Sequence, residues 1–476
     1  MRESQRGLLL AVAVLLLCAL LGGLYGQRVE ATATGDSDLQ ESLRTFTKVY
    51  AIIEQNYADP VDPERAIYGG AIPGMLRVLD PHSSFLDART FKLLKETQSG
   101  HYFGVGMQVA PRDGRTIVLA PFVGSPAYKA GVRPGDIIIQ VDDHPTEGLT
   151  TSEVADLLKG PKGTVVRIKV LREGHPEPLD FVITRDEIPR VSVEHAFYLR
   201  PGIAYIRIVD FNENTDKELT KALEQFDLRS LKGLLLDLRG NPGGLLQQGV
   251  DVADMFLAKN QLIVSHKGRA QRERQYYVRH GNQGIEYPLI VLIDRYSASA
   301  AEIVAGAIQD HDRGLIVGET SFGKALVQTV YHLSEETGLA LTTAKYYTPS
   351  GRLIQRDFKT VSLYSYYYRN QPESNSQREA YKTDAGRTVY GGGGIAPDVA
   401  VPYPRLNRFQ QLLLRHDVFF NFAKHFLADR ETVPREFIVD DSVLNRFRAF
   451  LQQQNIRFIE PDLQENRDWL ARQIKK

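Results

Sequence analysis

Two apolar segments, each followed by a small-residue turn and a helical pattern, constrain the fold of this 476-residue chain most strongly. The run YPLIVLID at 287–294 is typical of a buried strand, and residues 300–308 read as a helix that begins just beyond it. The run LLLDLRGNPGG at 234–244 predicts another strand and turn, followed by a helix over 245–257. Alternating strands and helices of this kind predict an α/β core.

Ser299 stands where the strand at 287–294 gives way to its helix, within the sequence SASAAE. At such a position a hydroxyl can be exposed, while the Ala300 amide at the positive end of the helix can receive a developing oxyanion. Serine is also favoured at helix N-caps, so a plain cap is the alternative interpretation.

Lys324 lies among small or apolar neighbours. An unperturbed lysine is a poor base with a pKa near 10.4, and burial is one way to lower that pKa to about 7. Gln328, four residues on, is expected to share a helical face with Lys324 and to hold its amine. Ser299 and Lys324 together suggest a serine nucleophile with a lysine base, and a solvated surface lysine is the alternative.

The turn after the strand at 234–238 is rich in glycine and proline. Glycine permits backbone angles that aim N–H groups into a cavity, and it lets a substrate carbonyl approach closely. Gly243 and Gly244 therefore predict a second oxyanion donor, and an ordinary strand-to-helix loop is the alternative.

With these segments the chain resembles the carboxy-terminal processing peptidases, also called tail-specific proteases, which use a Ser/Lys dyad. The resemblance spans roughly residues 40–400. It implies an α/β (α+β) multidomain protein with a crotonase-like peptidase core, and no cofactor. The matching segments are LDPHSSFLD at 79–87, FGVGMQV at 103–109, LDLRGNPGGLL at 236–246, SASAAEI at 297–303, GETSFGKALVQ at 318–328, LTTAKYYTPSGRLIQ at 341–355 and YGGGGIAPDV at 390–399.

Carried over by position, the resemblance makes Ser299 the nucleophile, Lys324 the general base and Gln328 the residue that orients the lysine. The amides implied for the oxyanion hole are those of Gly243 or Gly244, and Ala300.

The chain departs from the family at two positions. It has Ala301 where serine is frequent, and Ala325 where glycine is frequent. Neither residue is the proposed nucleophile or base, so the departures affect fine geometry.

Residues 100–188 read as a separate β-rich module that resembles a PDZ domain. Its strand patterns lie at 106–109, 116–120, 136–141 and 165–171. The loop of Gly104, Val105, Gly106 and Met107 resembles the one whose backbone N–H groups clasp a peptide's terminal carboxylate, with the peptide added as an edge strand. Protein or peptide substrates with free, apolar C termini are therefore expected.

Arg133 lies beside a turn in the run SPAYKAGVRPGD at 125–136, which matches the helix and turn of a PDZ domain. Because PDZ domains in this family can gate the active site, Arg133 is a regulatory candidate. A simple surface charge is the alternative.

Arg2 and Arg6 precede about 19 largely apolar residues, 7–25, a length that suits an export signal or a membrane anchor. The positive flank stays inside, so we expect an exported protein of the cell envelope, periplasmic or extracytoplasmic, anchored to the inner membrane by residues 7–25. The only cysteine, Cys18, lies in this segment, which excludes an intrachain disulfide and a thiol nucleophile elsewhere.

Four other patterns concern regions outside the dyad. Residues 39–97 read as helical, and an amphipathic helix is expected near the C-terminus. The sequence DPHS at 80–83 is interpreted as a structural turn, because a catalytic triad is assembled in space and not from neighbours. The tyrosine-rich stretch 357–388 is expected to form an inserted loop, with packed surface tyrosines favoured over an aromatic substrate platform. The residues that mark the C-terminal helix are Val443, Leu444, Phe447, Phe450 and Leu451.

The expected organisation has five regions. They are a signal peptide or membrane anchor at 1–27, a linker and N-terminal helical region at 28–99, the PDZ domain at 100–188, the peptidase core at 189–400 and a C-terminal helical region at 401–476.

The net charge and the spacing of the histidines limit the kinds of ligand and partner that the chain is expected to bind. Lysine plus arginine equals aspartate plus glutamate at 58, so nothing suggests nucleic acid. The scattered His195, His266, His280 and His311 lack ligand spacing, so neither a metal nor a catalytic histidine is expected. The sequence therefore predicts an exported serine endopeptidase. The further partners expected are an activating or adaptor protein and, in a homo-oligomer, other copies of the same chain. A catalytically silent PDZ scaffold in the cell envelope and an acyl-CoA enzyme are the alternatives.

Overall fold

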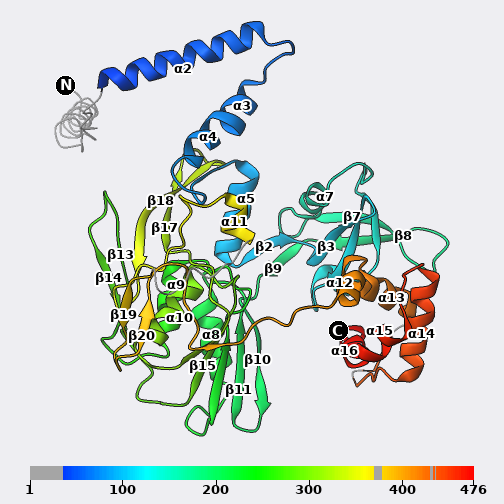
Figure 1. The fold of residues 1–476 in the computed structure, drawn as a ribbon. Helices are drawn as coiled ribbons and strands as arrows, with labels where there is room; N and C mark the ends of the chain where they lie inside the picture. The colour runs from blue at the N-terminus through cyan, green and yellow to red at the C-terminus, as the bar shows by residue number, and fades with distance from the viewer. Residues whose placement is uncertain (1–35, 369–377, 429–432, 435) are drawn as a thin grey trace, which may run out of the picture. The chain divides into compact units, whose positions relative to one another are not determined.

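The computed structural model describes residues 36–368, 378–428, 433–434 and 436–476, and the chain divides into two units, 1–72 and 73–476 (Figure 1). The described part of the first unit is helical, with α2 (Asp36–Asn56), α3 (Pro63–Ala66) and the π-helical turn η1 (Ile67–Ala71). Helix α2 lies within the linker and N-terminal helical region expected at 28–99. Apolar side chains at helical spacing along α2 are about half exposed, among them Phe46, Val49 and Ile53.

The expected signal or anchor at 7–25 lies outside the described residues. Among the helices that the structure does describe, none combines the length and hydrophobicity that a membrane crossing requires.

The second unit opens with α4 (Ile72–Arg77), β1 (Ser84–Leu86) and α5 (Ala88–Ser99). Within the region expected to be helical over 39–97, residues 80–83 form the expected turn, in which Asp80 accepts from the His82 amide. The prediction of a helix is wrong at 84–86, because β1 pairs antiparallel with β18 (Gly338–Tyr347).

The PDZ region contains an antiparallel sheet in the order β3-β4-β5-β7-β8, with β6 paired to β5. Each of the four expected strand patterns corresponds to a strand, which confirms them. Val118, Val154 and Val166 are among its fully buried core residues. The elements are β2 (His101–Gly104), β3 (Met107–Arg112), β4 (Arg115–Pro121), α6 (Pro126–Ala130), β5 (Ile137–Val141), β6 (His144–Pro145), α7 (Thr151–Leu158), β7 (Val165–Leu171), β8 (Leu179–Thr184) and β9 (Asp186–Pro189), of which β2 pairs with β9.

The main sheet of the peptidase region has the order β10-β11-β12-β15-β16-β21, parallel from β11 onward. Its central strands are continuous apolar runs because helices cover parallel strands. Neighbouring strands β12 and β15 end at one edge, which brings the glycine loop and the Ser299 turn together. The elements are β10 (Val193–Arg200), β11 (Ile203–Ile208), α8 (Thr215–Leu223), β12 (Gly233–Asp237), α9 (Leu246–Asp254), β15 (Leu289–Ile293), α10 (Ala300–Asp310), β16 (Leu315–Gly318) and β21 (Val399–Ala400).

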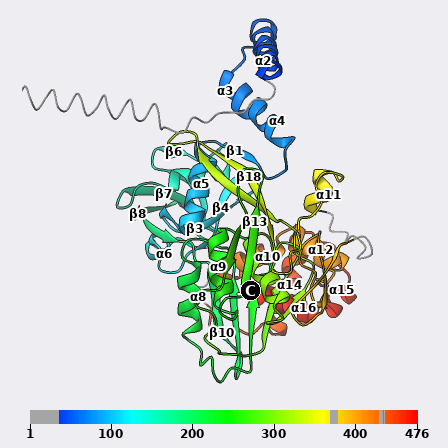
Figure 2. The same cartoon turned by 90° about the vertical axis from the view of Figure 1, so that its left-hand side faces the viewer.

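A second sheet, in the order β1-β18-β13-β14 with β17 paired to β18, covers the other side of α10. Helix α10 contacts both β13 and β16, and all of its residues are buried (Figures 1 and 2). The helix that carries the Ser299 turn is therefore held between two sheets. The remaining strands here are β13 (Leu262–Lys267), β14 (Arg274–Tyr277) and β17 (Leu326–His332).

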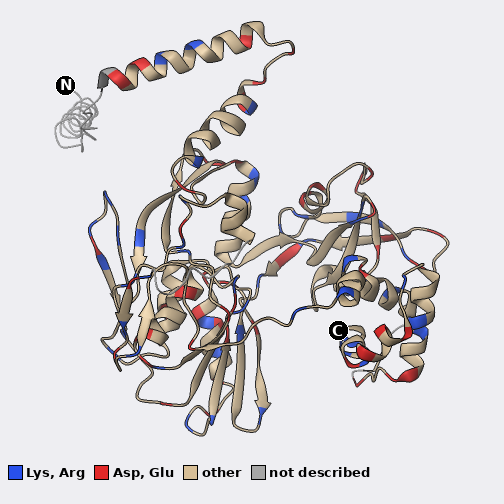
Figure 3. Cartoon of the chain, in the orientation of Figure 1, with Lys and Arg blue, Asp and Glu red and all other residues tan. Residues whose placement is uncertain are grey.

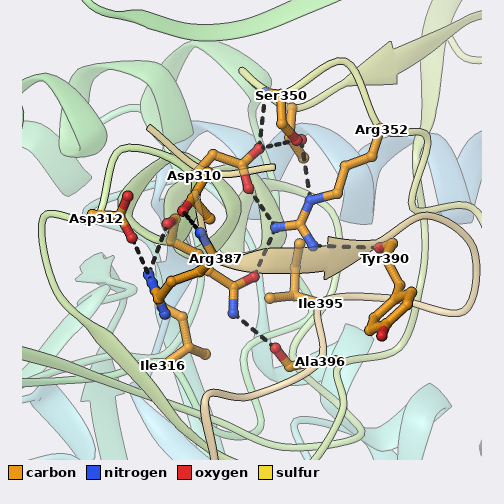
Figure 4. A network of polar contacts seen from close by, with 12 residues as sticks. Asp310, Asp312, Ile316, Ser350, Arg352, Arg387, Tyr390, Ile395 and Ala396 are labelled. Atoms are coloured by element: carbon orange, nitrogen blue, oxygen red, sulfur yellow. Dashed lines mark hydrogen bonds and ion pairs between the residues drawn. The ribbon is translucent and has the colours of Figure 1, made fainter. Parts of the chain in front are cut away.

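A buried polar network fastens the C-terminal end of α10 (Figure 4). Arg352 is fully buried and donates from Nη2 to Asp310 Oδ1 and to Gln309 Oε1, each at 2.7 Å. Ser350 donates to the other Asp310 oxygen from its amide at 3.0 Å and from its hydroxyl at 2.7 Å. Burial lowers the pKa of Arg352, and Asp310 opposes that shift.

The remaining described segments include a predominantly helical C-terminal region. Phe447 and Phe450 are buried on α14, which confirms the expected amphipathic helix. An ion pair of 3.0 Å between Arg112 and Asp417 joins these helices to the PDZ sheet. Acidic and basic residues occur together on the same helices, as on α2 and α14 (Figure 3). The elements are α11 (Leu363–Tyr368), β19 (Ala380–Lys382), β20 (Thr388–Tyr390), α12 (Arg408–Arg415), α13 (Val418–Leu427), α14 (Asp441–Gln453), α15 (Glu460–Glu465) and α16 (Arg467–Lys475).

Candidate active site

Ser299 occupies the turn between β15 and α10 in a strained backbone conformation, with φ of 53° and ψ of −115°. Such angles are costly for a residue with a Cβ and persist only where the surroundings enforce them. The Ser299 carbonyl accepts from the amides of Glu302 and Ile303, at 2.9 and 3.0 Å, and from the Tyr346 hydroxyl at 3.2 Å. The strain is thus maintained by contacts on the helix side and from β18.

Glu302 links the two segments that carry the predicted nucleophile and base. One carboxylate oxygen, Oε2, accepts from the backbone amides of Ser299 and Lys324, each at 2.9 Å. The other accepts from the Ser321 hydroxyl at 2.5 Å and the Gly323 amide at 2.6 Å. Burial raises the pKa of this fully buried carboxyl, while these hydrogen bonds favour its charged form.

Lys324 is partly buried, and its amine donates to Gln328 Oε1 at 3.1 Å. Burial lowers its pKa, against opposing attractions to Glu302 and Asp80. The Ser299 hydroxyl and the Lys324 amine are not joined by a hydrogen bond within the described part of the chain. Glu302 connects their backbones instead.

The expectation of a shared helical face for Lys324 and Gln328 is wrong. Lys324 precedes β17, and Gln328 lies within that strand. Gln328 pairs with Thr342 of β18, and the register shifts between Val327 and Gln328 because Thr343 is an extra residue on β18. Val327, Thr329 and Val330 belong to the β-branched residues that favour strands, and β18 supplies the pairing partner.

The turn at 80–83 is structural, as predicted, yet it also reaches the site. Asp80 Oδ1 accepts from the amides of His82 and Ser83, each at 2.8 Å. The Gln328 side-chain amide donates to the His82 carbonyl. Burial and the nearby Lys324 lower the pKa of His82 to about 4, so the imidazole is neutral at pH 7.

The glycine loop approaches Ser299 closely. A Cβ at Gly243 would lie 2.6 Å from the Ala298 carbonyl oxygen and 2.7 Å from Ser299 Cβ, and one at Gly244 would lie 2.1 Å from the Phe211 oxygen. Gly243 and Gly244 also have positive φ, so glycine is required both by the close contacts and by the backbone conformation. The Gly243 amide donates to Asn241 Oδ1 at 2.8 Å, whereas Gly244 is exposed.

The residues expected to bind a peptide carboxylate run from the last residue of β2, Gly104, to the first residue of β3, Met107. Strand β3 is at the edge of the PDZ sheet and contacts α7. Gly106 has φ of 76°, and a Cβ there would lie 2.5 Å from that of Ser125. The Ser125 hydroxyl donates to the Gly106 carbonyl at 2.7 Å, which fixes the loop. The other three residues of this loop are Gly104, Val105 and Met107, all buried.

Arg133 is exposed and lines a cavity of about 520 Å³ between the PDZ sheet and α13. The Arg133 backbone amide donates to Asp136 Oδ2 at 2.8 Å, and this hydrogen bond is internal to the turn. Lys424 and Phe420 of α13 line the same cavity. Arg133 therefore faces the C-terminal helices.

Sequence reasoning missed three contributors to this site. They are Glu302, the His82 carbonyl and Tyr346. Only Glu302 carried a readable signal, because the sequence Ser299-x-x-Glu302 has the spacing of a capping box.

Four family profiles match the chain. Peptidase family S41 matches residues 202–360 and a PDZ domain matches 117–172. The N-terminal domain of the activating protease CtpB matches 25–90, and the C-terminal helical domain of a probable PDZ-protease matches 409–474.

Several relatives share most of the chain. A carboxy-terminal-processing protease of Bartonella bacilliformis is 40% identical over 329 residues, which are 68% of this chain and 75% of that protein. Carboxy-terminal processing protease CtpB of Bacillus subtilis is 35% identical over 331 residues, 69% of this chain and 68% of its own. The solved photosystem II D1 C-terminal processing protease is 31% identical with a TM-score of 0.40, and the match covers 75% of this chain and 86% of that one. The chain therefore belongs to peptidase family S41, among the carboxy-terminal processing proteases that carry a PDZ domain.

Proposed function

We propose that this protease is an exported serine endopeptidase that works through Ser299 and Lys324. The observation that carries the proposal is the Glu302 carboxylate oxygen that binds the amides of both residues at 2.9 Å. The lowered pKa of Lys324 supports it further, because a neutral amine at working pH can accept the serine proton. Hydrogen bonds between catalytic groups are often long in free enzymes and tighten with substrate.

In the proposed reaction Lys324 takes the proton of Ser299, whose oxygen attacks the scissile carbonyl. The Ala300 amide and the loop of Gly243 and Gly244 stabilise the oxyanion, and Lys324 returns a proton to the leaving amine. Water then hydrolyses the acyl-enzyme. Gln328 orients the lysine amine throughout.

Substrate selection is proposed to begin at the PDZ domain. The edge position of β3 supports addition of a peptide strand, and the Gly104–Met107 loop would bind the free carboxylate. In this mode of recognition alternate side chains of the added strand are bound in pockets, and apolar tails are proposed to fill them. Arg133 would couple tail binding to catalysis through the C-terminal helices that it faces.

Localisation and assembly follow as further parts of the proposal. Residues 7–25 would anchor the chain to the inner membrane, with the protease on the extracytoplasmic side. The exposed apolar face of α2 supports a homo-oligomer, because such surfaces are usually covered by a partner. The match of residues 25–90 to the N-terminal domain profile of the activating protease CtpB supports a protease that acts with other proteins, and an activating or adaptor protein is proposed as a further partner.

The proposal is tested with an unfolded protein that ends in apolar residues, with and without C-terminal amidation. Products are read by mass spectrometry beside a Ser299→Ala control. Cleavage that needs Ser299 and falls on amidation supports the proposal. Cleavage that is indifferent to amidation contradicts tail recognition, and cleavage by the Ser299→Ala variant contradicts the proposed nucleophile.

A further inference from the structure

The tyrosine-rich helix α11 contacts the turn at 80–83 beside the lysine base. Tyr366 of this helix is 1% exposed, and its hydroxyl lies 2.8 Å from His82 Nε2. The Tyr367 hydroxyl donates to the Pro81 carbonyl at 3.2 Å. Two adjacent tyrosines of α11 therefore hold this turn.

From Tyr366 a continuous chain of contacts runs to Lys324. The His82 ring contacts the Tyr366 hydroxyl, and the His82 backbone carbonyl accepts a hydrogen bond from the Gln328 side-chain amide. Gln328 in turn accepts from the Lys324 amine at 3.1 Å. Only His82 and Gln328 stand between the tyrosine hydroxyl and the amine.

A second path joins the same hydroxyl to the segment that carries the base. The Gln355 side-chain nitrogen lies 3.3 Å from the Tyr366 hydroxyl, and Gln355 Oε1 accepts from the Ala325 amide at 2.8 Å. Ala325 directly follows Lys324. The hydroxyl thus bridges the turn that supports Gln328 and the loop that holds Lys324.

The other partners of the Gln355 side chain determine the direction of its hydrogen bond with Tyr366. Gln355 Oε1 accepts from Ala325, and its nitrogen donates to the Arg356 carbonyl at 2.9 Å, so that nitrogen also donates to Tyr366. Since burial raises the pKa of Tyr366 to about 12 and lowers that of His82 to about 4, the phenol stays protonated and the imidazole stays neutral. The phenol donates to Nε2 when the His82 proton is on Nδ1, and its oxygen accepts from Nε2 in the other tautomer. In either tautomer the contact joins the Tyr366 hydroxyl to the His82 ring.

Aromatic packing fixes the Tyr366 ring independently of its hydroxyl. Phe322, two residues before Lys324, meets it edge-on at 5.4 Å between centroids, and Phe358 does so at 6.2 Å. The Arg356 guanidinium donates to the Tyr366 carbonyl at 3.2 Å. Replacing the tyrosine by phenylalanine would keep this packing and remove only the hydroxyl.

We propose that Tyr366 is a positioning residue for the lysine base: its hydroxyl fixes His82, and the His82 carbonyl fixes Gln328 and the Lys324 amine. The inference rests on the proposed Ser299 and Lys324 mechanism. Helix α11 then serves catalysis through His82 and Gln328.

The test uses the purified full chain and a peptide that the wild-type enzyme cleaves. Tyr366→Phe should lower kcat roughly threefold to tenfold and leave KM unchanged, as expected for one lost hydrogen bond that orients the base. Tyr368→Phe is the matched control, because Tyr368 lies on the same helix and is 75% exposed. It should leave kcat and KM unchanged.

A double-mutant cycle separates positioning from general destabilisation. His82→Phe removes the same hydrogen bond from the other side and keeps the backbone carbonyl. The double variant should therefore be no slower than the slower single variant. An unchanged kcat in Tyr366→Phe, a change confined to KM, or losses that multiply in the double variant would overturn the proposal.

A spectroscopic measurement keeps the test independent of turnover. With ¹⁵N-histidine in the inactive Ser299→Ala chain, the Nε2 resonance of His82 should shift in Tyr366→Phe, with His82→Phe giving the assignment. The absence of a shift overturns the positioning role. If the wild type instead fails to cleave or Ser299→Ala cleaves, the proposed function fails, and this signal still decides the Tyr366 contact.

Discussion

The Lys324 amine lies 3.1 Å from Oε1 of Gln328, and the contact joins a loop residue to a residue of β17. A neutral amide is an acceptor that adds no negative charge beside the lysine. The amine therefore keeps a partner without the strong stabilisation of its charged form that a carboxylate would supply.

Gln328→Glu should raise the pKa of Lys324, because a carboxylate favours the ammonium form. Since only the neutral amine accepts the serine proton, the rising limb of kcat/KM against pH should move to higher pH by about one unit or more. At pH 7 this means a loss of roughly tenfold. The control is Gln452→Glu, an exposed position on α14, whose profile should match the wild type.

Glu302→Gln should impair both stability and activity. A glutamine has one acceptor oxygen, so its NH₂ group would face either the Ser299 and Lys324 amides or the Gly323 amide and the Ser321 hydroxyl, all of which now donate to the carboxylate. We expect a loss of about 2–4 kcal/mol in the free energy of unfolding and a large fall in kcat. The exposed Glu224→Gln is the control for a charge change alone. A Glu302→Gln enzyme with wild-type kcat would exclude the linking role.

His82 should make stability depend on pH between about 4 and 6.5. Its pKa is about 6.5 in an unfolded chain and about 4 in the native state, so the unfolded state binds more protons in this window. The contribution is fully present above pH 6.5 and is lost as pH falls toward 4, by at most about 3 kcal/mol. Urea unfolding at pH 7 and pH 4.5 measures this loss. The loss of unfolding free energy between these two pH values should be smaller in His82→Phe than in the wild type, and it should be unchanged in the exposed His144→Phe.

Arg352→Ala should destabilise the end of α10 strongly. It would leave Asp310, which is 1% exposed, as a buried and unpaired charge at a cost of about 3–5 kcal/mol (Figure 4). Arg448→Ala breaks an exposed pair with Glu460 and should cost no more than about 1 kcal/mol. Equal midpoints of thermal unfolding for the two variants would contradict the structural role of the network.

Local patterns were sufficient for the elements that carry the site. The apolar runs at 234–238 and 287–294 correctly predicted two strands. The structure shows that these strands pair in parallel, which places Ser299 and the glycine loop together. The helix after the first run is shorter than expected, since α9 ends at Asp254. The PDZ strands were equally readable, because each is bounded by glycine or proline turns.

Contacts between distant segments were not predictable in this way. Nothing in the sequence places His82 against Gln328, or Tyr366 against His82, because β1 must first pair with β18 and α11 must fold back onto the turn at 80–83. Gln328 was assigned to a helix because its spacing from Lys324 fits one. Gln328 lies in a strand because β17 pairs with β18, and intrinsic strand propensity does not identify that pairing partner.

The most direct test of the Ser299 mechanism is to trap the acyl-enzyme. Wild-type enzyme is mixed with a cleavable peptide and quenched in acid within the first turnover, and its peptides are then mapped by mass spectrometry. The account predicts the acyl portion of the substrate on the peptide that contains Ser299, with no adduct in Ser299→Ala and a strongly reduced amount in Lys324→Ala. An adduct on another residue, or turnover in the Ser299→Ala variant, would contradict it.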